Sequence, residues 1–191
     1  NVEPDLATFG KGMANGFALA ALVGRREIME LGSIRNEGAE RVFLISTTHG
    51  SEMSAFGAFN AAVEVYRSSA VTDHLWDYGR KLIAGLNGLA KQHGIERNFE
   101  AHGFACSPSF TTRDPNGDPS FPFRTLWAQE MIKGSVMMPF VALSSAHGES
   151  ELDQTLMAAN NALRVYATAL NEGIDKYLVG PAIKPVFRKH N

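Results

Sequence analysis

The sequence predicts a protein of the α/β or α+β layer type. Short apolar runs bounded by glycine, which are typical of strands, alternate with longer stretches whose apolar residues recur at helical spacing. Clusters of Gly, Pro, Asn and Asp separate these segments and predict turns. No internal repeat or low-complexity segment interrupts the alternation, and 191 residues are enough to build a hydrophobic core.

The first part of the chain, to about residue 70, combines short strands with one long helix. The strands are apolar runs bounded by glycine, as expected for strands buried in a sheet. The long helix is rich in alanine and glycine, so it can pack closely against a sheet or a partner subunit. The expected elements are strands over 6–9, 19–23 and 42–45, and helices over 25–31 and 52–67.

The second part, from about residue 71, contains the longer helices. Each shows one apolar face at helical spacing and ends close to a glycine. Residues 113–119, RDPNGDP, are too rich in turn formers for regular structure. The expected elements are helices over 72–93, 123–133 and 149–172, and strands over 98–102, 105–111 and 140–144.

Composition excludes several classes of function. A formal net charge of -2, with the 18 Lys and Arg scattered, is too balanced for a nucleic-acid or anionic-membrane partner. No apolar run is long enough to span a bilayer. The single cysteine, Cys106, excludes an internal disulfide and fits a reducing compartment, so we expect a cytoplasmic protein. His102 and His147 lack a second ligand at metal spacing, so we expect no metal site.

Lys11 is the strongest candidate for chemistry. It follows a short apolar run and precedes a loop punctuated by Gly12 and Gly16, so its amine can approach a carbonyl without bulky neighbours. A lysine acts as a Schiff-base nucleophile when its amine is partly neutral. The alternative is an ordinary surface lysine in an exposed loop.

Residues 4–11 read PDLATFGK, and GMANGFALAALVGRREIME follows. This segment around Lys11 resembles the lysine region of the class III pyridoxal-phosphate-dependent aminotransferases. The resemblance continues at residues 46–52, STTHGSE, and into the C-terminal half. The most similar branch is that of the glutamate-1-semialdehyde aminomutases. The resemblance implies fold type I of the pyridoxal-phosphate enzymes, with residues 1–70 as the end of the large-domain sheet and residues 71–191 as a linking helix and small C-terminal α/β domain.

The resemblance also implies a site. Lys11 would hold pyridoxal 5'-phosphate as an internal aldimine and move a proton at the substrate alpha carbon. Thr47, with Ser46, would bind the cofactor phosphate across the interface of a homodimer with a shared active site. A helix N-terminus at this place favours an anion. The alternative is that Ser46, Thr47 or Ser51 only caps the helix.

The function implied is transfer of an amino group from a small-molecule amino donor to a keto or aldehyde acceptor. Alternatives are the intramolecular transfer of an aminomutase, and a decarboxylase or racemase on the same cofactor. A non-catalytic assembly subunit is the alternative from another class, and an intact Lys11 argues against it. Because family members place the phosphate loop and ring-nitrogen Asp upstream of the lysine, we expect this chain to be the C-terminal part of a longer subunit.

Overall fold

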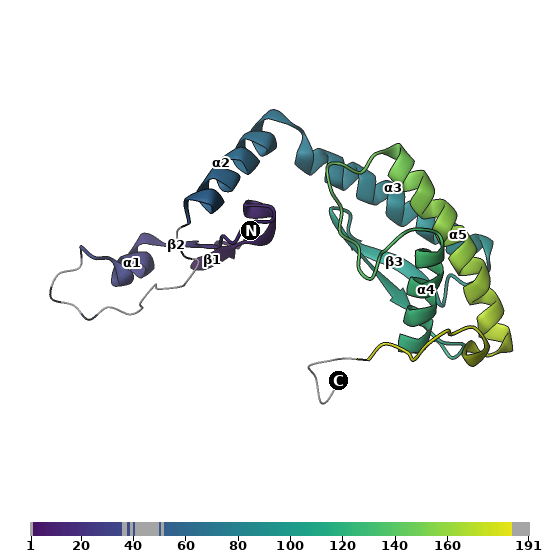
Figure 1. Ribbon diagram of the computed structural model, residues 1–191. Helices are drawn as coiled ribbons and strands as arrows, with labels where there is room; N and C mark the ends of the chain where they lie inside the picture. Colours follow the sequence, from purple (N-terminus) through teal and green to yellow (C-terminus); the bar gives the residue numbers. More distant parts are fainter. Residues whose placement is uncertain (1, 36–37, 39, 41–49, 51, 185–191) are drawn as a thin grey trace. The chain divides into compact units, whose positions relative to one another are not determined.

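The computed structural model describes residues 2–35, 38, 40, 50 and 52–184 (Figure 1). The chain forms two compact units, Asn1–Ala70 and Val71–Asn191, and each is described by itself. The strand expected over 42–45 lies outside the described residues. The assignment of the two units to a large and a small domain stays a prediction.

The first unit begins with a β-hairpin. Strand β1, Leu6–Phe9, pairs antiparallel with β2, Ala21–Gly24, so that Leu6 lies opposite Gly24. A side chain at Gly24 has no room, because a Cβ there falls 2.4 Å from the Asp5 carbonyl oxygen. The helix expected over 25–31 forms as a short α-helix, α1 (Arg26–Met29), and a 3-10 turn, Glu30–Gly32.

The expectation that these strands are buried is wrong for this chain. Leu6, Phe9 and Val23 are 44%, 54% and 46% exposed. The physical reason is the size of the sheet. In the described part of the unit β1 pairs only with β2, and the apolar side chains of a two-stranded ribbon stay in water unless another layer covers them.

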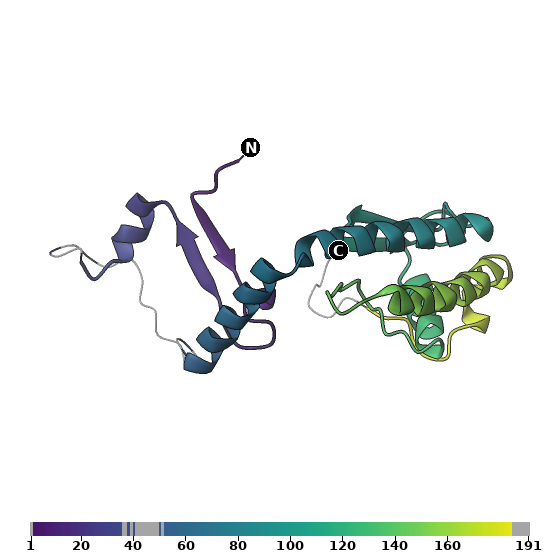
Figure 2. The same ribbon diagram turned by 90° about the horizontal axis from the view of Figure 1, so that it is seen from above.

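Helix α2, Met53–Ser68, completes the first unit, within one residue of the helix expected over 52–67. It contacts the loop that follows β1, and Figures 1 and 2 show it running beside the hairpin. The two buried apolar residues among those described in this unit are small: Ala14, in that loop, and Ala55, in the first turn of α2. The alanines permit the close packing that the composition of the helix predicted.

The second unit packs three helices with a second hairpin. The elements are α3 (Val71–Gln92), β3 (Phe99–Phe104), β4 (Ser107–Thr112), α4 (Phe121–Lys133), α5 (Glu149–Glu172) and a 3-10 turn (Ile174–Lys176). Helices α3 and α5 lie side by side in both views (Figures 1 and 2), and α4 packs on α5. Strands β3 and β4 pair antiparallel and contact α3. None of the helices in the described ranges is long and apolar enough to cross a membrane.

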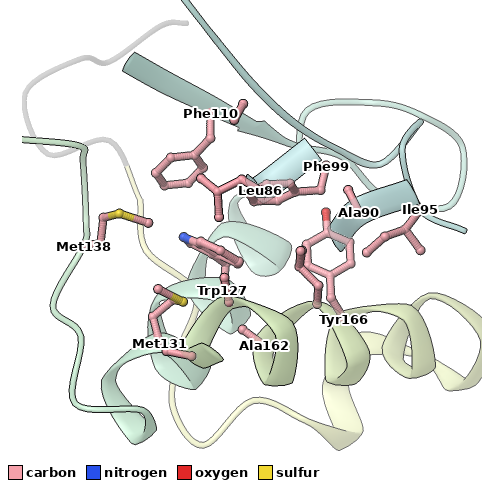
Figure 3. Packing of buried hydrophobic residues seen from close by; sticks show 14 of the residues in the cluster. Leu86, Ala90, Ile95, Phe99, Phe110, Trp127, Met131, Met138, Ala162 and Tyr166 are labelled. Carbon is pink, nitrogen blue, oxygen red and sulfur yellow. The ribbon is translucent and has the colours of Figure 1, made fainter. Parts of the chain in front are cut away.

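Aromatic side chains fill the core of the second unit (Figure 3). The Phe99 and Trp127 rings lie 4.6 Å apart between centroids, and so do those of Phe123 and Tyr166. The Tyr166 hydroxyl accepts from the Arg113 backbone N–H at 2.9 Å and donates to the Arg113 carbonyl at 2.6 Å. Burial of each large apolar side chain stabilises the fold by about 2 to 3 kcal/mol. This unit therefore has a hydrophobic core of its own.

The helix limits follow from the residues at their ends. The Ser120 side chain accepts from the Phe123 backbone N–H, which starts α4 two residues earlier than expected. Pro122 is tolerated there because the first turn leaves its N–H groups free. Helix α3 ends before Gly94, whose φ of +69° suits glycine. Helix α5 spans the residues expected.

The strand expected over 140–144 does not form. The segment carries the alternation of a strand, since Val141 and Leu143 pack on the core while Phe140 is 67% exposed. No described strand pairs with it, and the Ser144 N–H instead donates to His147 Nδ1 at 3.3 Å. Burial on alternate residues therefore occurs here without a β-ladder.

Candidate active site

Lys11 lies in the loop that joins the two strands of the first hairpin. Strand β1 ends at Phe9, Gly10 follows in extended conformation, and Lys11–Met13 form a single 3-10 turn. The Met13 N–H donates to the Gly10 carbonyl at 3.1 Å, and the Asn15 N–H donates to the Lys11 carbonyl at 3.2 Å. The apolar strand and the glycine thus present the lysine at the tip of a hydrogen-bonded turn.

The backbone of Lys11 is strained. Its φ of +49° lies in the left-handed region, which costs a non-glycine residue about 1 to 2 kcal/mol. Such outliers persist where surrounding structure holds them, and they gather at functional sites. The side chain is exposed, and no carboxylate within the described ranges forms an ion pair with its ammonium group. The Lys11 amine is therefore accessible to a ligand.

The turn expected at Asn15 and Gly16 is confirmed. Both residues adopt positive φ, +42° and +109°, and asparagine tolerates this conformation better than other residues with a side chain. The chain reverses here and returns as β2. The turn therefore sets the length of the loop that carries Lys11.

An ion pair at the open end of the hairpin was not predicted from the sequence. Arg25 Nη1 lies 3.2 Å from Asp5 Oδ1, and the Arg25 N–H donates to the Asp5 carbonyl at 3.0 Å. Both side chains are largely exposed, so the pair contributes less than about 1 kcal/mol. The signal was available, since the two residues flank the two runs expected to form strands.

The predicted phosphate ligands, Ser46 and Thr47, lie outside the described residues. Their roles in binding a cofactor phosphate, and the alternative that they cap α2, both stay predictions.

Two polar side chains of the second unit, those of Arg124 and His102, have partners within the fold. Arg124 Nη2 donates to the Pro139 carbonyl at 2.9 Å, and its guanidinium lies 4.7 Å from the centre of the Phe110 ring. His102 Nε2 lies 2.8 Å from the hydroxyl oxygen of Thr111. In the described ranges no three His, Cys, Asp or Glu residues gather as metal ligands. These contacts favour structural roles for Arg124 and His102.

The second unit also contains a cavity of about 390 Å³ that sequence patterns did not indicate. Residues 135–143 form one wall, α3 and α5 contribute others, including Tyr78 and Glu151, and His147 joins them from the turn before α5. Burial, followed by the nearby charges of Glu151 and Glu149, raises the pKa of Tyr78.

The chain belongs to the class-III aminotransferase family, whose model matches residues 1–134. It is 32% identical over 137 residues to the 3-aminobutyryl-CoA aminotransferase of Cloacimonas acidaminovorans, covering 72% of this chain and 31% of that protein. It is 30% identical over 182 residues to a glutamate-1-semialdehyde 2,1-aminomutase of Desulforamulus reducens, covering 87% and 40%. The chain thus spans about a third to two fifths of the length of these relatives.

A solved structure gives the same result for the fold. The FumI protein of Sphingopyxis sp. MTA144, solved in its PLP internal aldimine form, matches 90% of this chain and 39% of its own, with a TM-score of 0.74 and 25% identity. The chain is therefore an α/β segment whose fold matches part of this structure. The predicted resemblance to this family, with aminomutases among the relatives, is confirmed.

Proposed function

We propose that this chain carries the cofactor-binding lysine of a pyridoxal-phosphate-dependent aminotransferase. The observation that supports the proposal is the geometry of Lys11, which is exposed on a strained, glycine-flanked turn directly after a strand. An amine that pairs with no carboxylate of the described residues suits covalent attachment to an aldehyde. The exposed Lys11 amine on this turn therefore fits the aldehyde group of the cofactor.

Bound pyridoxal 5'-phosphate supplies an electron sink for the substrate alpha carbon. Lys11 has two roles. Its Nζ would hold the cofactor, and its amine would move a proton at the substrate alpha carbon. Gly10 and Gly12 leave the approach to that amine free of side chains. The chemistry moves an amino group from a small-molecule donor to a keto or aldehyde acceptor.

The proposed assembly is a homodimer in which the segment with Ser46 and Thr47 contributes to a shared active site. Support comes from the resemblance of residues 46–52 to the family motif, and from the alanines on the helix that follows. The cytoplasm is the proposed location, and that proposal rests on the single cysteine. Sedimentation of the full-length protein tests the dimer, and a fully active monomer contradicts it.

An intramolecular amino transfer is the second candidate, because several of the relatives are glutamate-1-semialdehyde aminomutases. Both activities need the same lysine. Conversion of a single substrate without an added amino acceptor distinguishes the aminomutase from the aminotransferase.

The lysine is tested by Lys11→Ala in the full-length protein, with Lys91→Ala, an exposed lysine on α3, as the matched control. Lys11→Ala is expected to abolish both turnover and the visible absorbance of the lysine-bound cofactor, because no other group forms that bond. Circular dichroism should stay unchanged, since an exposed side chain is lost. Normal turnover in Lys11→Ala refutes the proposal, and a colourless wild-type protein supports the non-catalytic alternative.

A further inference from the structure

The loop that carries Lys11 is tied to a second element. Tyr66 stands in the last turn of α2, 54 residues after Gly12, and its hydroxyl donates to the Gly12 carbonyl oxygen at 3.4 Å. Gly12 directly follows the lysine. The Gly12 carbonyl belongs to the peptide between Gly12 and Met13, so a contact there restrains the Lys11–Met13 turn that carries the nucleophile.

The hydrogen bond from Tyr66 attaches the Lys11 loop to α2, which the hydrogen bonds within the loop do not do. The two bonds within the turn, to the Gly10 and Lys11 carbonyls, close it on itself but do not fix it against the rest of the unit. Lys11 is held at a φ of +49°, which an unsupported loop leaves readily. Helix α2 packs against the turn, with Ala14 and Ala55 buried, so it is a rigid base for such support.

Glycine at position 12 belongs to the same contact. A Cβ built there lies 3.4 Å from the Tyr66 oxygen, at the near edge of ordinary contact. Larger side chains would push the hydroxyl away from the carbonyl. The glycine thus leaves room for the tyrosine as well as for a ligand.

We propose that Tyr66 is a positioning residue for Lys11. Its hydroxyl restrains the Gly12 carbonyl, and through the Lys11–Met13 turn it restrains the backbone from which the lysine side chain projects. The inference rests on the proposed function of Lys11. Tyr66 is 51% exposed, so its contribution lies in orientation rather than in burial.

The test compares Tyr66→Phe with Ser68→Ala in the full-length protein loaded with pyridoxal phosphate. Tyr66→Phe removes the hydroxyl and keeps the ring. Ser68 is the matched control, because its hydroxyl also sits at the end of α2 but donates to the Glu64 carbonyl of its own helix. Tyr66→Phe is expected to lower kcat about three- to tenfold, as for one lost hydrogen bond, with KM unchanged.

Two further readouts separate positioning from general stability. The pH midpoint of the visible absorbance of the lysine-bound cofactor should shift in Tyr66→Phe and not in Ser68→Ala. In the cofactor-free protein, the Asn15 amide should exchange hydrogen faster in Tyr66→Phe only. Equal kcat and equal midpoints in the two variants overturn the inference. Loss of helix content in Tyr66→Phe also counts against it. If Lys11→Ala keeps the visible band, the proposed function fails instead.

Discussion

At Gly79 the backbone of α3 lies so close to the turn between β3 and β4 that a methyl group has no room. A Cβ there falls 1.7 Å from the Ala105 carbonyl oxygen and 2.6 Å from its carbon. Both are backbone atoms, so neither can rotate away. The absence of a side chain at this position lets the hairpin pack directly on the helix.

We expect Gly79→Ala to destabilise the second unit by about 1 to 3 kcal/mol, because the overpacked hairpin must shift. Gly88→Ala on the same helix is the control. Its Cβ meets nothing within 4 Å, and it should stabilise the unit by up to about 1 kcal/mol through helix propensity. Urea unfolding of the 191-residue chain followed by tryptophan fluorescence measures both, since Trp76 and Trp127 lie in this unit. Equal stabilities of Gly79→Ala and wild type contradict the packing argument.

Some features of single residues were predictable from the sequence and some were not. The turn at Asn15 and Gly16 follows from the residue types. The left-handed φ of Lys11 does not, because lysine has no preference for that region, and neighbouring bonds impose it. The hydrogen bond from Tyr66 joins residues 54 apart, and no local pattern indicates it.

At the scale of elements, the helices were predicted within two residues of their ends because apolar spacing and capping residues act locally. The start of α5 depends on one carboxylate. Glu151 Oε2 accepts from the Gly148 backbone N–H at 2.8 Å. The N–H groups of Gly148 and of Glu151 itself lower the pKa of this carboxyl. The charged form therefore stabilises the first turn.

Glu151→Gln keeps an acceptor oxygen and removes the charge, so it should reduce stability at neutral pH. A carboxyl whose folded-state pKa is lowered contributes stability above its unfolded pKa and loses it as the pH falls through its folded pKa. The difference between wild type and Glu151→Gln should therefore shrink as acid protonates the wild-type carboxyl. Urea unfolding at several pH values measures it, with Asp153→Asn, two residues further along α5, as the control. If the stability difference between wild type and Glu151→Gln is the same at every pH, the prediction is contradicted.

The strand expected over 140–144 marks the limit of this local prediction. Its alternation is present, but a strand exists only where another strand offers its N–H and C=O groups, and pattern alone does not reveal a partner. Pro139 has no N–H, and its carbonyl accepts from Arg124. The Pro139 carbonyl at this end therefore bonds to a side chain and not to a neighbouring strand.

At the scale of the whole molecule, burial differs between the two units. The second unit contains a core cluster of buried aromatic and aliphatic residues, from Tyr78 to Ala169. Among the described residues of the first unit, only Ala14 and Ala55 are buried apolar residues. The apolar runs that form β1 and β2 were predicted correctly as strands. Their burial was not, because it depends on layers that β1 and β2 do not supply to each other.

The two units of the 191-residue chain should therefore differ in local stability. Amides of α3, α4 and α5 are expected to exchange slowly. The opening that exposes them also exposes the core, so its free energy should be close to that of global unfolding. Amides of β1, β2 and the Lys11 loop should exchange with little protection, and the chain alone should not retain pyridoxal phosphate. Hydrogen exchange by mass spectrometry measures this, and residues 71–191 produced alone should keep the same tryptophan unfolding transition. If amides of β1 and β2 are as protected from hydrogen exchange as those of α5, and the chain binds the cofactor stoichiometrically, then the first unit is stable without a further layer over β1 and β2.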